Sequence, residues 1–418
     1  MGNLLGRRLN GTLYVGINTK FYASSLLPFL LSKTLSNYHI LIVMSHINKA
    51  SNTKHYQMQL TLLPTVLLSI TCLYCGLFTD ALPSTDGRKH KFLRSGKLPI
   101  PTQDQDNSHV ITVTVDDNTP LGPFQRQRFV ERNVTVFDPA YKGKGQSKRP
   151  LVLAYHGVMS DSETMRQLTQ LDREAKDRGW VAAYPQGEWT YFRKMTNWNG
   201  AGCCSQGQDD ISFTKVMIEY MVEHFNVDEN KVYVTGVSNG GFMVYRLLCE
   251  MGHRESGKPW IAAASVHSGL LGAWNADFSS CSISTETPLV HFHGLADPIV
   301  NTTGKAEGKA EFGLSFPPVT KAEWKSVNAS VGYVAEAMCG SSVITSTSKP
   351  TESTTCHQMC HGKAEYCMVE ELQHMWSGCS NKTLNMYDPH HATNVDATKY
   401  FADSFERHRK NESDVIDQ

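Results

Sequence analysis

The chain carries no excess of either charge. Its 418 residues include 40 lysines and arginines and 40 aspartates and glutamates, so the formal net charge at pH 7 is zero. A protein of balanced charge has no electrostatic reason to bind nucleic acid or an anionic membrane as its main partner. We therefore expect neither as a partner, and the function has to be sought in local groups of residues.

The sequence also lacks internal repeats, low-complexity tracts and a clear boundary between two folded domains. Hydrophobic residues make up 40% of the chain and charged residues 19%. This is the composition of a globular protein with a substantial core. We predict one folded domain over residues 108–410, preceded by a polar linker over 82–107 and followed by a polar tail over 411–418.

An apolar stretch near the N-terminal end predicts a secretory signal. Residues 60–78 are apolar and are followed by small and polar residues around Ala81, so residues 58–81 fit a cleaved signal peptide. The stretch is almost long enough to span a membrane, which keeps a single membrane anchor as the alternative. Residues 1–57 show little pattern, and we interpret them as a non-native or disordered extension before a start at Met58.

The cysteines and the glycosylation triplets agree with secretion. Nine cysteines follow the signal segment: Cys203, Cys204, Cys249, Cys281, Cys339, Cys356, Cys360, Cys367 and Cys379. So many predict disulfides in an oxidising compartment, and an odd number leaves at least one thiol free or paired between chains. Five asparagines stand in N-x-S/T triplets, namely Asn133, Asn301, Asn328, Asn381 and Asn411. We predict a secreted, extracellular glycoprotein.

The order of apolar segments predicts an α/β domain. Residues 109–117 and 127–137 alternate between apolar and polar side chains, as antiparallel strands do. Continuous apolar runs, typical of strands buried on both faces, then alternate with helix-like segments. The runs are 150–157, 180–187, 231–236, 260–269, 288–294 and 364–372, and the helix-like segments are 161–178, 209–225, 240–252 and 394–408. We predict a mostly parallel central sheet flanked by helices, with antiparallel strands at its N-terminal edge.

A G-x-S-x-G pattern marks one junction between a strand and a helix. Gly236-Val-Ser238-Asn-Gly240 directly follows an apolar run and directly precedes a helix-like segment. This placement is the one that a nucleophile elbow requires, because small residues on both sides let the backbone turn sharply and leave the serine oxygen exposed. The alternative is a glycine-rich turn with a capping serine. The context favours Ser238 as a nucleophile.

A serine nucleophile needs a base, and the base needs an orienting acid. In an elbow of this type the chain order is serine, acid, histidine. Asp297 comes just past a buried strand, in a turn closed by Pro298, and is our candidate for the acid. Asp277 is the alternative, but it follows no buried strand.

The candidate for the base is His374, which lies in a loop just past the last predicted strand. His390 and His391 lie one loop further on and remain the alternative. His156 precedes the serine, which is the wrong order for the base, and we interpret it as a residue that shapes its loop.

Two backbone N–H groups are needed to hold the developing oxyanion. Asn239, directly after the serine, supplies one of them. The second is expected from the loop after the first buried run, where Val158 is the preferred candidate and Met159 the alternative.

With these residues in place, the segment from about 128 to 408 resembles the secreted polyhydroxybutyrate depolymerases and feruloyl esterases of the α/β-hydrolase family. The resemblance is carried, in order, by "LVLAYHG", "YPQG", "NWNGAGCCSQGQDDISF", "VYVTGVSNGGFMVYRL", "PLVHFHGLADPIV", "AMCG", "HMWSG" and "NVDATKYFADSF". It implies the α/β-hydrolase fold and ester hydrolysis through an acyl-serine intermediate, with Ser238, Asp297 and His374 as the triad and no cofactor.

The resemblance bears on other residues as well. It matches Cys203 and Cys204 to a cysteine pair of the family, and a bond from one of them to Cys249 would brace the elbow. The sequence departs from the family at Leu372-Gln373 before the histidine and at Ser377 after the tryptophan, and it has no added polymer-binding module.

Two further groups of residues have alternative interpretations. The cysteines and histidines of residues 356–367 suggest zinc, but their spacing fits no tight zinc pattern and the compartment is oxidising, so we expect disulfides and no metal. Trp376 and Trp198 are candidates for lining an acyl pocket, with Trp189 and Tyr191 behind them. For each of these aromatic residues a position in the core is the alternative.

Taken together, the sequence predicts a secreted single-domain serine esterase that acts on a small-molecule or polymer ester. The alternative is a catalytically silent hydrolase fold used for binding or adhesion. The complete set of elbow, acid and histidine argues against that alternative. The residues leave open whether the substrate is a hydroxyalkanoate ester or an aromatic acyl ester on a polysaccharide.

Overall fold

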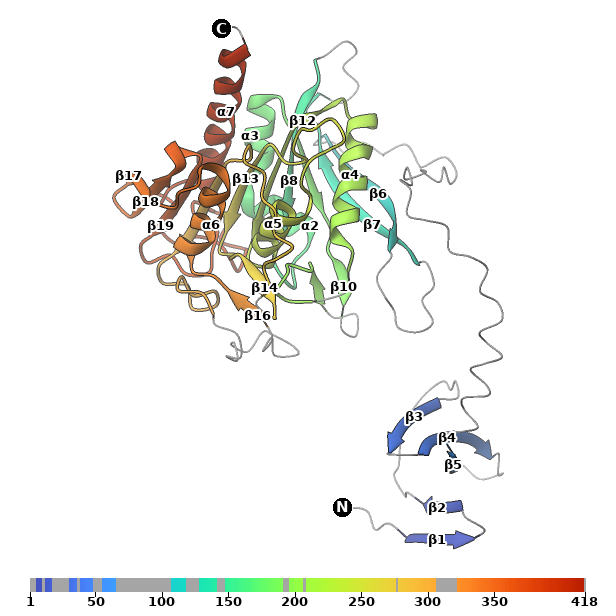
Figure 1. Ribbon diagram of the computed structural model, residues 1–418. Helices are drawn as coiled ribbons and strands as arrows, with labels where there is room; N and C mark the ends of the chain where they lie inside the picture. The colour runs from blue at the N-terminus through green and yellow to red at the C-terminus, as the bar shows by residue number, and fades with distance from the viewer. Residues whose placement is uncertain are drawn as a thin grey trace. The chain divides into compact units, whose positions relative to one another are not determined.

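Figure 1 shows the computed structural model of the chain. It divides into two units, Met1–Lys97 and Leu98–Gln418. The residues that the structure describes are 5–9, 12–16, 30–35, 38–47, 55–64, 107–117, 128–140, 147–190, 195–205, 208–275, 277–305 and 322–416.

The first unit contains five strands. β1 (Leu5–Leu9) and β2 (Thr12–Gly16) form one antiparallel pair. β3 (Leu30–Leu35), β4 (Tyr38–Ile47) and β5 (His55–Pro64) form an antiparallel sheet. This unit covers the predicted extension and signal segment. Most of the signal segment lies outside the described residues, so its cleavage stays a prediction. None of the helices in the described ranges is both long and apolar enough to cross a membrane.

The second unit is organised around a ten-stranded sheet with the order β17-β18-β19-β15-β13-β12-β8-β9-β7-β6. Its six central strands, from β19 to β9, run parallel. The strand bounds are β6 Ser108–Asp117, β7 Arg128–Phe137, β8 Arg149–Tyr155, β9 Val181–Pro185, β12 Val227–Val237, β13 Ala263–His267, β15 Leu289–Gly294, β17 Ile344–Thr351, β18 Thr354–Met359 and β19 Ala364–Val369. The mostly parallel sheet and the antiparallel edge of β6 and β7 are as predicted.

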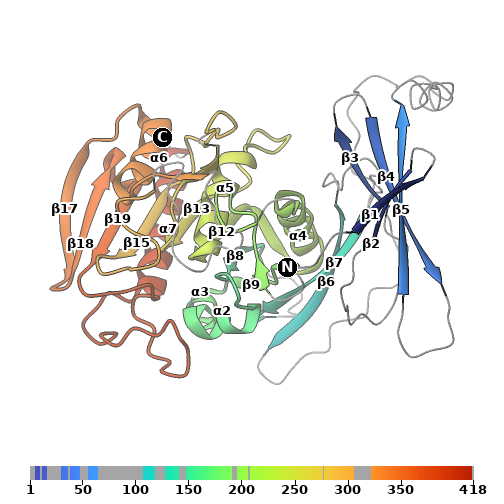
Figure 2. The ribbon, with the colours of Figure 1, turned by 90° about the horizontal axis from the view of Figure 1, so that it is seen from below.

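Helices cover both faces of this sheet (Figure 2). α4 (Asp210–His224), α5 (Asn239–Glu250) and α6 (Val327–Cys339) pack on one face, and their apolar side chains form one core layer. α2 (Ser162–Thr169), α3 (Leu171–Arg178) and α7 (Ala397–Ile416) enclose the second layer on the other face. The central strands are therefore buried on both faces, and all seven residues of β8 are buried. This double burial explains why these strands are continuous apolar runs.

Short elements connect the larger ones. β10 (Glu188–Thr190) pairs with β11 (Met195–Asn197), and β14 (Gly272–Trp274) pairs with β16 (Ala322–Trp324). A 3₁₀ turn, η1, covers Cys360–Gly362.

Three predicted elements differ from the observed ones. The single helix predicted over residues 161–178 is two helices, because Gln170 between them is left-handed with φ 50°. The antiparallel hairpin of β17 and β18 was not predicted, since β17 is polar and almost entirely exposed and has no apolar run. α7 reaches Ile416 and so extends beyond the predicted end at residue 408 into the predicted polar tail.

Four disulfides join cysteines of the described residues: Cys203–Cys204, Cys249–Cys281, Cys339–Cys360 and Cys356–Cys367. The sequence left the pairing open. The bond considered from Cys203 or Cys204 to Cys249 does not form, because Cys203 and Cys204 bond to each other and Cys249 bonds to Cys281 in the loop before β15. Cys356 and Cys367 face each other across β18 and β19. Cys379 is buried and free.

Candidate active site

Ser238 stands at a sharp turn between a strand and a helix. β12 ends at Val237 and α5 begins at Asn239, with Ser238 between them at φ 55° and ψ −122°. A non-glycine residue in this region costs on the order of 1–3 kcal/mol, which the surrounding structure has to supply. The Ser238 N–H donates to the carbonyl of His267 at 2.8 Å, and the Ser238 carbonyl accepts from Phe242 at 3.0 Å. The turn is thus held from both sides.

The glycines beside Ser238 are required by close backbone contacts. A Cβ atom on Gly236 would lie 2.3 Å from the carbonyl oxygen of Gly240, and one on Gly240 would lie 2.1 Å from that of Tyr155. No side chain fits at such distances. The pattern read in the sequence therefore reflects how tightly β12, α5 and the end of β8 approach one another.

Asp297 and His374 come together at the carboxyl ends of two neighbouring parallel strands. Asp297 follows β15 and His374 follows β19, and His374 Nδ1 lies 2.7 Å from Asp297 Oδ2. Among the alternatives, Asp277 is in an exposed turn. The imidazole of His390 is half exposed and lies 3.8 Å from a Glu371 oxygen. Of the candidate acids and bases, the structure pairs Asp297 with His374.

The two loops that carry this pair are joined through their backbones. Ala296 N–H donates to the Leu372 carbonyl at 3.1 Å, and Leu295 N–H donates to the Val369 carbonyl at 2.9 Å. A Cβ atom on Gly294 would lie 2.1 Å from the Leu372 oxygen. The loops after β15 and β19 therefore lie in direct contact, which limits the movement of the acid relative to the histidine.

Asp297 is placed to remain a carboxylate. Burial alone would raise its pKa, but hydrogen bonds from His293 and His374 hold the pKa well below its ordinary value. The second oxygen, Oδ1, accepts from the backbone N–H groups of Ile299 at 2.8 Å and Val300 at 2.9 Å. An ionised carboxylate that accepts these bonds can orient an imidazole and stabilise its protonated form.

The elbow and the histidine loop meet through a buried residue of β13, which lies between β12 and β15. His267, at the end of β13, accepts the N–H of Ser238 and stacks on Trp376, with ring centroids 3.8 Å apart. Trp376 is two residues after His374. Ser238, Asp297 and His374 therefore lie along one edge of the sheet.

The loop after β8 adjoins the serine. A Cβ atom on Gly157 would lie 3.4 Å from the Cβ of Ser238. The N–H of Met159 donates to the Thr196 carbonyl at 2.8 Å and is therefore occupied. Of the two candidates in this loop, Val158 is favoured, because its N–H has no hydrogen-bond partner among the residues that the structure describes.

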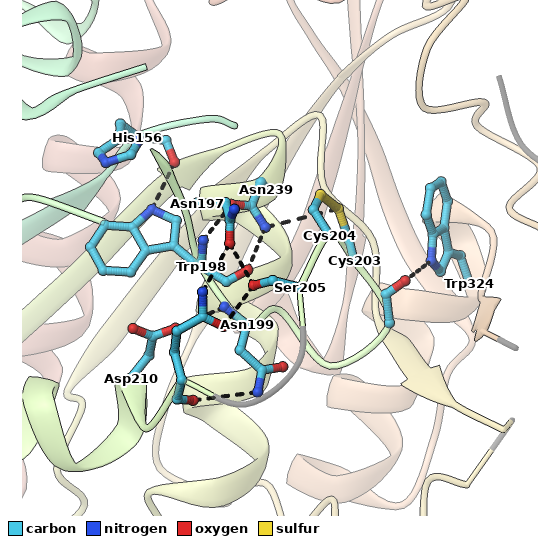
Figure 3. Close-up of a disulfide and its surroundings, with 12 residues drawn as sticks. His156, Asn197, Trp198, Asn199, Cys203, Cys204, Ser205, Asp210, Asn239 and Trp324 are labelled. Atoms are coloured by element: carbon cyan, nitrogen blue, oxygen red, sulfur yellow. Dashed lines mark hydrogen bonds between the residues drawn. A yellow bond between two sulfur atoms is a disulfide. The ribbon is translucent and has the colours of Figure 1, made fainter. Parts of the chain in front are cut away.

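Asn239 begins α5, and the first N–H groups of a helix have no partner within it. Its side chain is held by Trp198, because Oδ1 accepts from the Trp198 N–H at 2.7 Å and Nδ2 donates to the Trp198 carbonyl at 2.9 Å (Figure 3). Figure 3 also shows the bonded pair of Cys203 and Cys204 beside this amide. The loop from β11 thus clamps the start of α5.

Trp198 and Trp376 were candidates for lining an acyl pocket, with a position in the core as the alternative, and in the structure both are core residues. Trp198 is fully buried, and its Nε1 donates to the carbonyl of His156 at 2.9 Å. Trp376 is 1% exposed, and its Nε1 donates to Thr398 Oγ1 at 3.1 Å. Both rings are covered by protein, so neither presents a face to a ligand. Trp189 is 58% exposed, and Tyr191 lies outside the described residues.

His156 shapes its loop in the way its position suggested. Nε2 accepts from the Gly187 N–H at 2.9 Å, and Nδ1 lies 2.6 Å from the Gly157 carbonyl. Burial lowers its pKa to about 4, so the ring is neutral at pH 7. A buried ion pair that was not predicted lies nearby, in which Arg132 Nη1 is 2.5 Å from Asp210 Oδ1.

His293 was not among the predicted site residues, although its Nε2 lies 3.4 Å from Asp297 Oδ2. The signal was present in the motif "HFHGLAD". Alternation along a strand puts His291 and His293 on one face, and Asp297 follows four residues later.

No protein-family model matches the chain. Several curated relatives match parts of the chain. A bifunctional acetylxylan esterase/xylanase from Neocallimastix patriciarum is 25% identical over 181 residues, which are 43% of this chain and 24% of that protein. Feruloyl esterase B from Piromyces equi is 26% identical over 160 residues, 38% of this chain and 28% of that protein. Poly(3-hydroxyalkanoate) depolymerase C from Paucimonas lemoignei is 32% identical over 104 residues, 22% of this chain and 23% of that protein.

The chain therefore spans about a quarter of the length of these relatives. Among solved structures, an acetyl xylan esterase from Aspergillus awamori aligns with 63% of this chain and 93% of its own at 14% identity and a TM-score of 0.42. The sheet order and the elbow of this chain carry the fold assignment. The chain has the α/β-hydrolase fold, and the proteins to which its sequence is similar include a feruloyl esterase and a poly(3-hydroxyalkanoate) depolymerase.

Proposed function

We propose that the chain is a secreted serine esterase that hydrolyses carboxylic esters through an acyl-serine intermediate. One observation carries the proposal: the strained turn that presents Ser238 lies on the same sheet edge as the hydrogen-bonded pair of Asp297 and His374. A fold used only for binding has no need of this arrangement. The three named relatives are esterases or depolymerases, which supports the same reaction.

In the proposed reaction, Ser238 Oγ attacks the ester carbonyl while His374 Nε2 takes the hydroxyl proton. The N–H groups of Asn239 and Val158 hold the oxyanion. The intermediate collapses, the alcohol leaves with the proton from His374, and an acyl-serine remains. Water then attacks the acyl group and gives its proton to His374, and the acid product is released with restoration of the serine hydroxyl.

Asp297 supports both halves of this cycle. Its Oδ2 accepts from His374 Nδ1, which leaves Nε2 unprotonated and able to act as the base. When His374 becomes an imidazolium, the carboxylate stabilises the positive charge. We expect the reaction to need no cofactor and no metal.

The exposed apolar residues near the site favour an ester with an apolar acyl group. Met159 is 57% exposed beside the proposed oxyanion loop, and Leu295 and Ile299 are 54% and 38% exposed on either side of Asp297. Exposed large apolar side chains gathered around a site commonly bind apolar ligand surface. An acetyl group is too small to contact these side chains, so we propose that the substrate carries an aromatic or a longer hydroxyalkanoate acyl group.

We test this with p-nitrophenyl acetate and butyrate, methyl ferulate, hydroxybutyrate oligomers and acetylated xylan, compared by kcat/KM. Each additional buried CH₂ contributes about 0.8 kcal/mol, so we expect kcat/KM to rise on the order of tenfold from acetate to butyrate. The paired variant Leu295→Ser with Ile299→Ser should lose this preference and keep the rate on acetate. A preference for acetylated xylan over the other esters would contradict the apolar acyl group.

The alternative of a silent fold is tested on the same protein. We expect covalent labelling by a fluorophosphonate and activity that survives a chelator. Absence of both labelling and hydrolysis would favour the binding function, and loss of activity with the chelator would point to a metal-dependent hydrolase.

Secretion rests on the signal segment and on the placement of the glycan acceptors. Asn133, Asn301 and Asn328 are exposed, and Asn381 is partly exposed, so each presents its amide at the surface. After expression in insect cells, we expect protein in the medium that begins near Ala81 and gains mobility on PNGase F treatment. Protein retained in the membrane with residues 58–81 intact would support the membrane anchor.

A further inference from the structure

A row of buried polar side chains lies behind the proposed acid. Tyr245 on α5, His291 and His293 on β15 and the carboxylate of Asp297 are each at most 6% exposed. Tyr245 Oη lies 2.9 Å from His291 Nδ1, and His291 Nε2 lies 3.1 Å from His293 Nδ1. His293 Nε2 then lies 3.4 Å from Asp297 Oδ2. The row thus ends on the oxygen that also accepts from His374.

The hydrogen bonds of this row have one consistent direction. His293 Nε2 lies 2.8 Å from the carbonyl of Val300, which can only accept, so Nε2 carries a proton. In the neutral ring Nδ1 is then an acceptor, so it receives the proton of His291 Nε2. His291 Nδ1 in turn accepts from the Tyr245 hydroxyl. Every polar atom of the two rings is satisfied with both rings neutral.

Burial favours the neutral form of His291 and of the neighbouring His267. The ionisable groups that interact with His293 are His291, His267 on β13, and Asp297. Burial holds the pKa of His291 and of His267 well below the ordinary value, and neighbouring histidines lower each further. Burial also raises the pKa of the Tyr245 phenol well above its ordinary value, so the hydroxyl keeps its proton.

We propose that His293 is a positioning residue of the reaction. Its single Nε2–H is shared between the Val300 carbonyl at 2.8 Å and Asp297 Oδ2 at 3.4 Å, which keeps the carboxylate aligned on His374, while Tyr245 and His291 fix the tautomer that carries this proton. This inference rests on the proposed function. His293 can position the acid because a carboxylate oxygen that lies against two donors has less freedom to rotate than one that lies against a single donor. Such an oxygen also presents less negative charge to His374, which limits the basicity of that imidazole.

The sign of the effect follows from this sharing. Removing the His293 donor leaves the Oδ2 charge to His374 alone, so the pKa of His374 rises. His374 must be neutral to take the serine proton, so the acid limb of kcat/KM moves to higher pH. A loosened carboxylate also misplaces the imidazole, which lowers kcat.

The test uses two variants of the full chain. In His293→Leu we expect the acid limb to move up by about half a pH unit or more. We also expect kcat to fall on the order of ten- to a hundredfold. In His293→Gln the amide nitrogen reaches the position of Nε2 and donates to the same oxygen, so the wild-type profile should return. His109→Leu, which removes a buried histidine from β6 at the far edge of the sheet, should leave the profile unchanged.

A measurement without turnover separates this inference from the esterase proposal. In ¹⁵N-labelled Ser238→Ala protein, NMR of the imidazoles should show His291 and His293 neutral and protonated at Nε2 at pH 7. It should also show a higher pKa for His374 in the double variant Ser238→Ala/His293→Leu than in Ser238→Ala alone. An unprotonated Nε2 on His293, or an unchanged pKa of His374 in that variant, would overturn the inference. If the wild-type protein hydrolyses no ester, the proposed function fails while the NMR result still decides the role of His293.

Discussion

Ser238→Ala is expected to lower kcat on p-nitrophenyl butyrate by about 10⁴- to 10⁶-fold, because no acyl-enzyme can form without the serine oxygen. The backbone at residue 238 is held by His267 and Phe242 and not by the side chain, so the fold should persist. A small residual rate is expected, since the oxyanion N–H groups still stabilise attack by water. The measurement is the steady-state rate, with thermal unfolding recorded in parallel.

The matched control is Ser265→Ala in β13. Ser265 is fully buried, and its hydroxyl has no hydrogen-bond partner among the described residues, so its removal should cost little stability and no activity. Equal rates for the wild-type protein and Ser238→Ala would remove the serine from the mechanism. A loss of activity in Ser265→Ala of similar size would show that the assay reports folding and not chemistry.

Asp297→Asn is expected to lower kcat by about 10⁴-fold with little change in KM. Oδ1 of the carboxylate accepts from two backbone N–H groups, Oδ2 accepts from His374 Nδ1, and His293 Nε2 lies 3.4 Å from Oδ2. An amide has one oxygen, so one pair of donors faces an NH₂ group instead. His374 then loses the partner that orients its Nδ1 proton and stabilises its charged form. Kinetics from pH 5 to 9 measure the effect.

Asp277→Asn is the control for this substitution. Asp277 is exposed, and its side chain accepts from the backbone of Ser279 in its own turn. We expect wild-type kinetics in Asp277→Asn. The reverse result, with activity lost at residue 277 and kept at residue 297, would assign the acid to the other loop. The low pKa of Asp297 also predicts that the acid limb of the wild-type profile reflects titration of a histidine and not of this carboxylate.

The elements predicted best from the sequence are the strands that are buried on both faces. Strands such as β8 are buried on both faces and therefore show as unbroken apolar runs, so the central sheet was readable. The hairpin strand β17 is exposed and polar, and its pairing depends on β18 and β19. The break at Gln170 left no mark in the apolar spacing, because the side chains of α2 and α3 continue to face the same core layer.

For the site, the sequence by itself determined the local chemistry: a serine between glycines at a strand–helix junction, followed by an acid and a histidine in the required order. Close backbone contact leaves a direct trace in residue type, because no Cβ fits at Gly236 or Gly240. The sequence already favoured Asp297 and His374, but only the tertiary structure placed them in contact, since the two residues are 77 positions apart and meet through neighbouring strands.

The tertiary structure alone also decided which cysteines pair, that Trp198 and Trp376 are core residues, and that His293 lies 3.4 Å from Asp297. These facts depend on which side chains share a small volume after the chain has folded. Residue type and spacing indicate the secondary structure and the chemistry that each segment supports. Which side chains from different segments come into contact is decided only when the sheet brings the ends of its strands together.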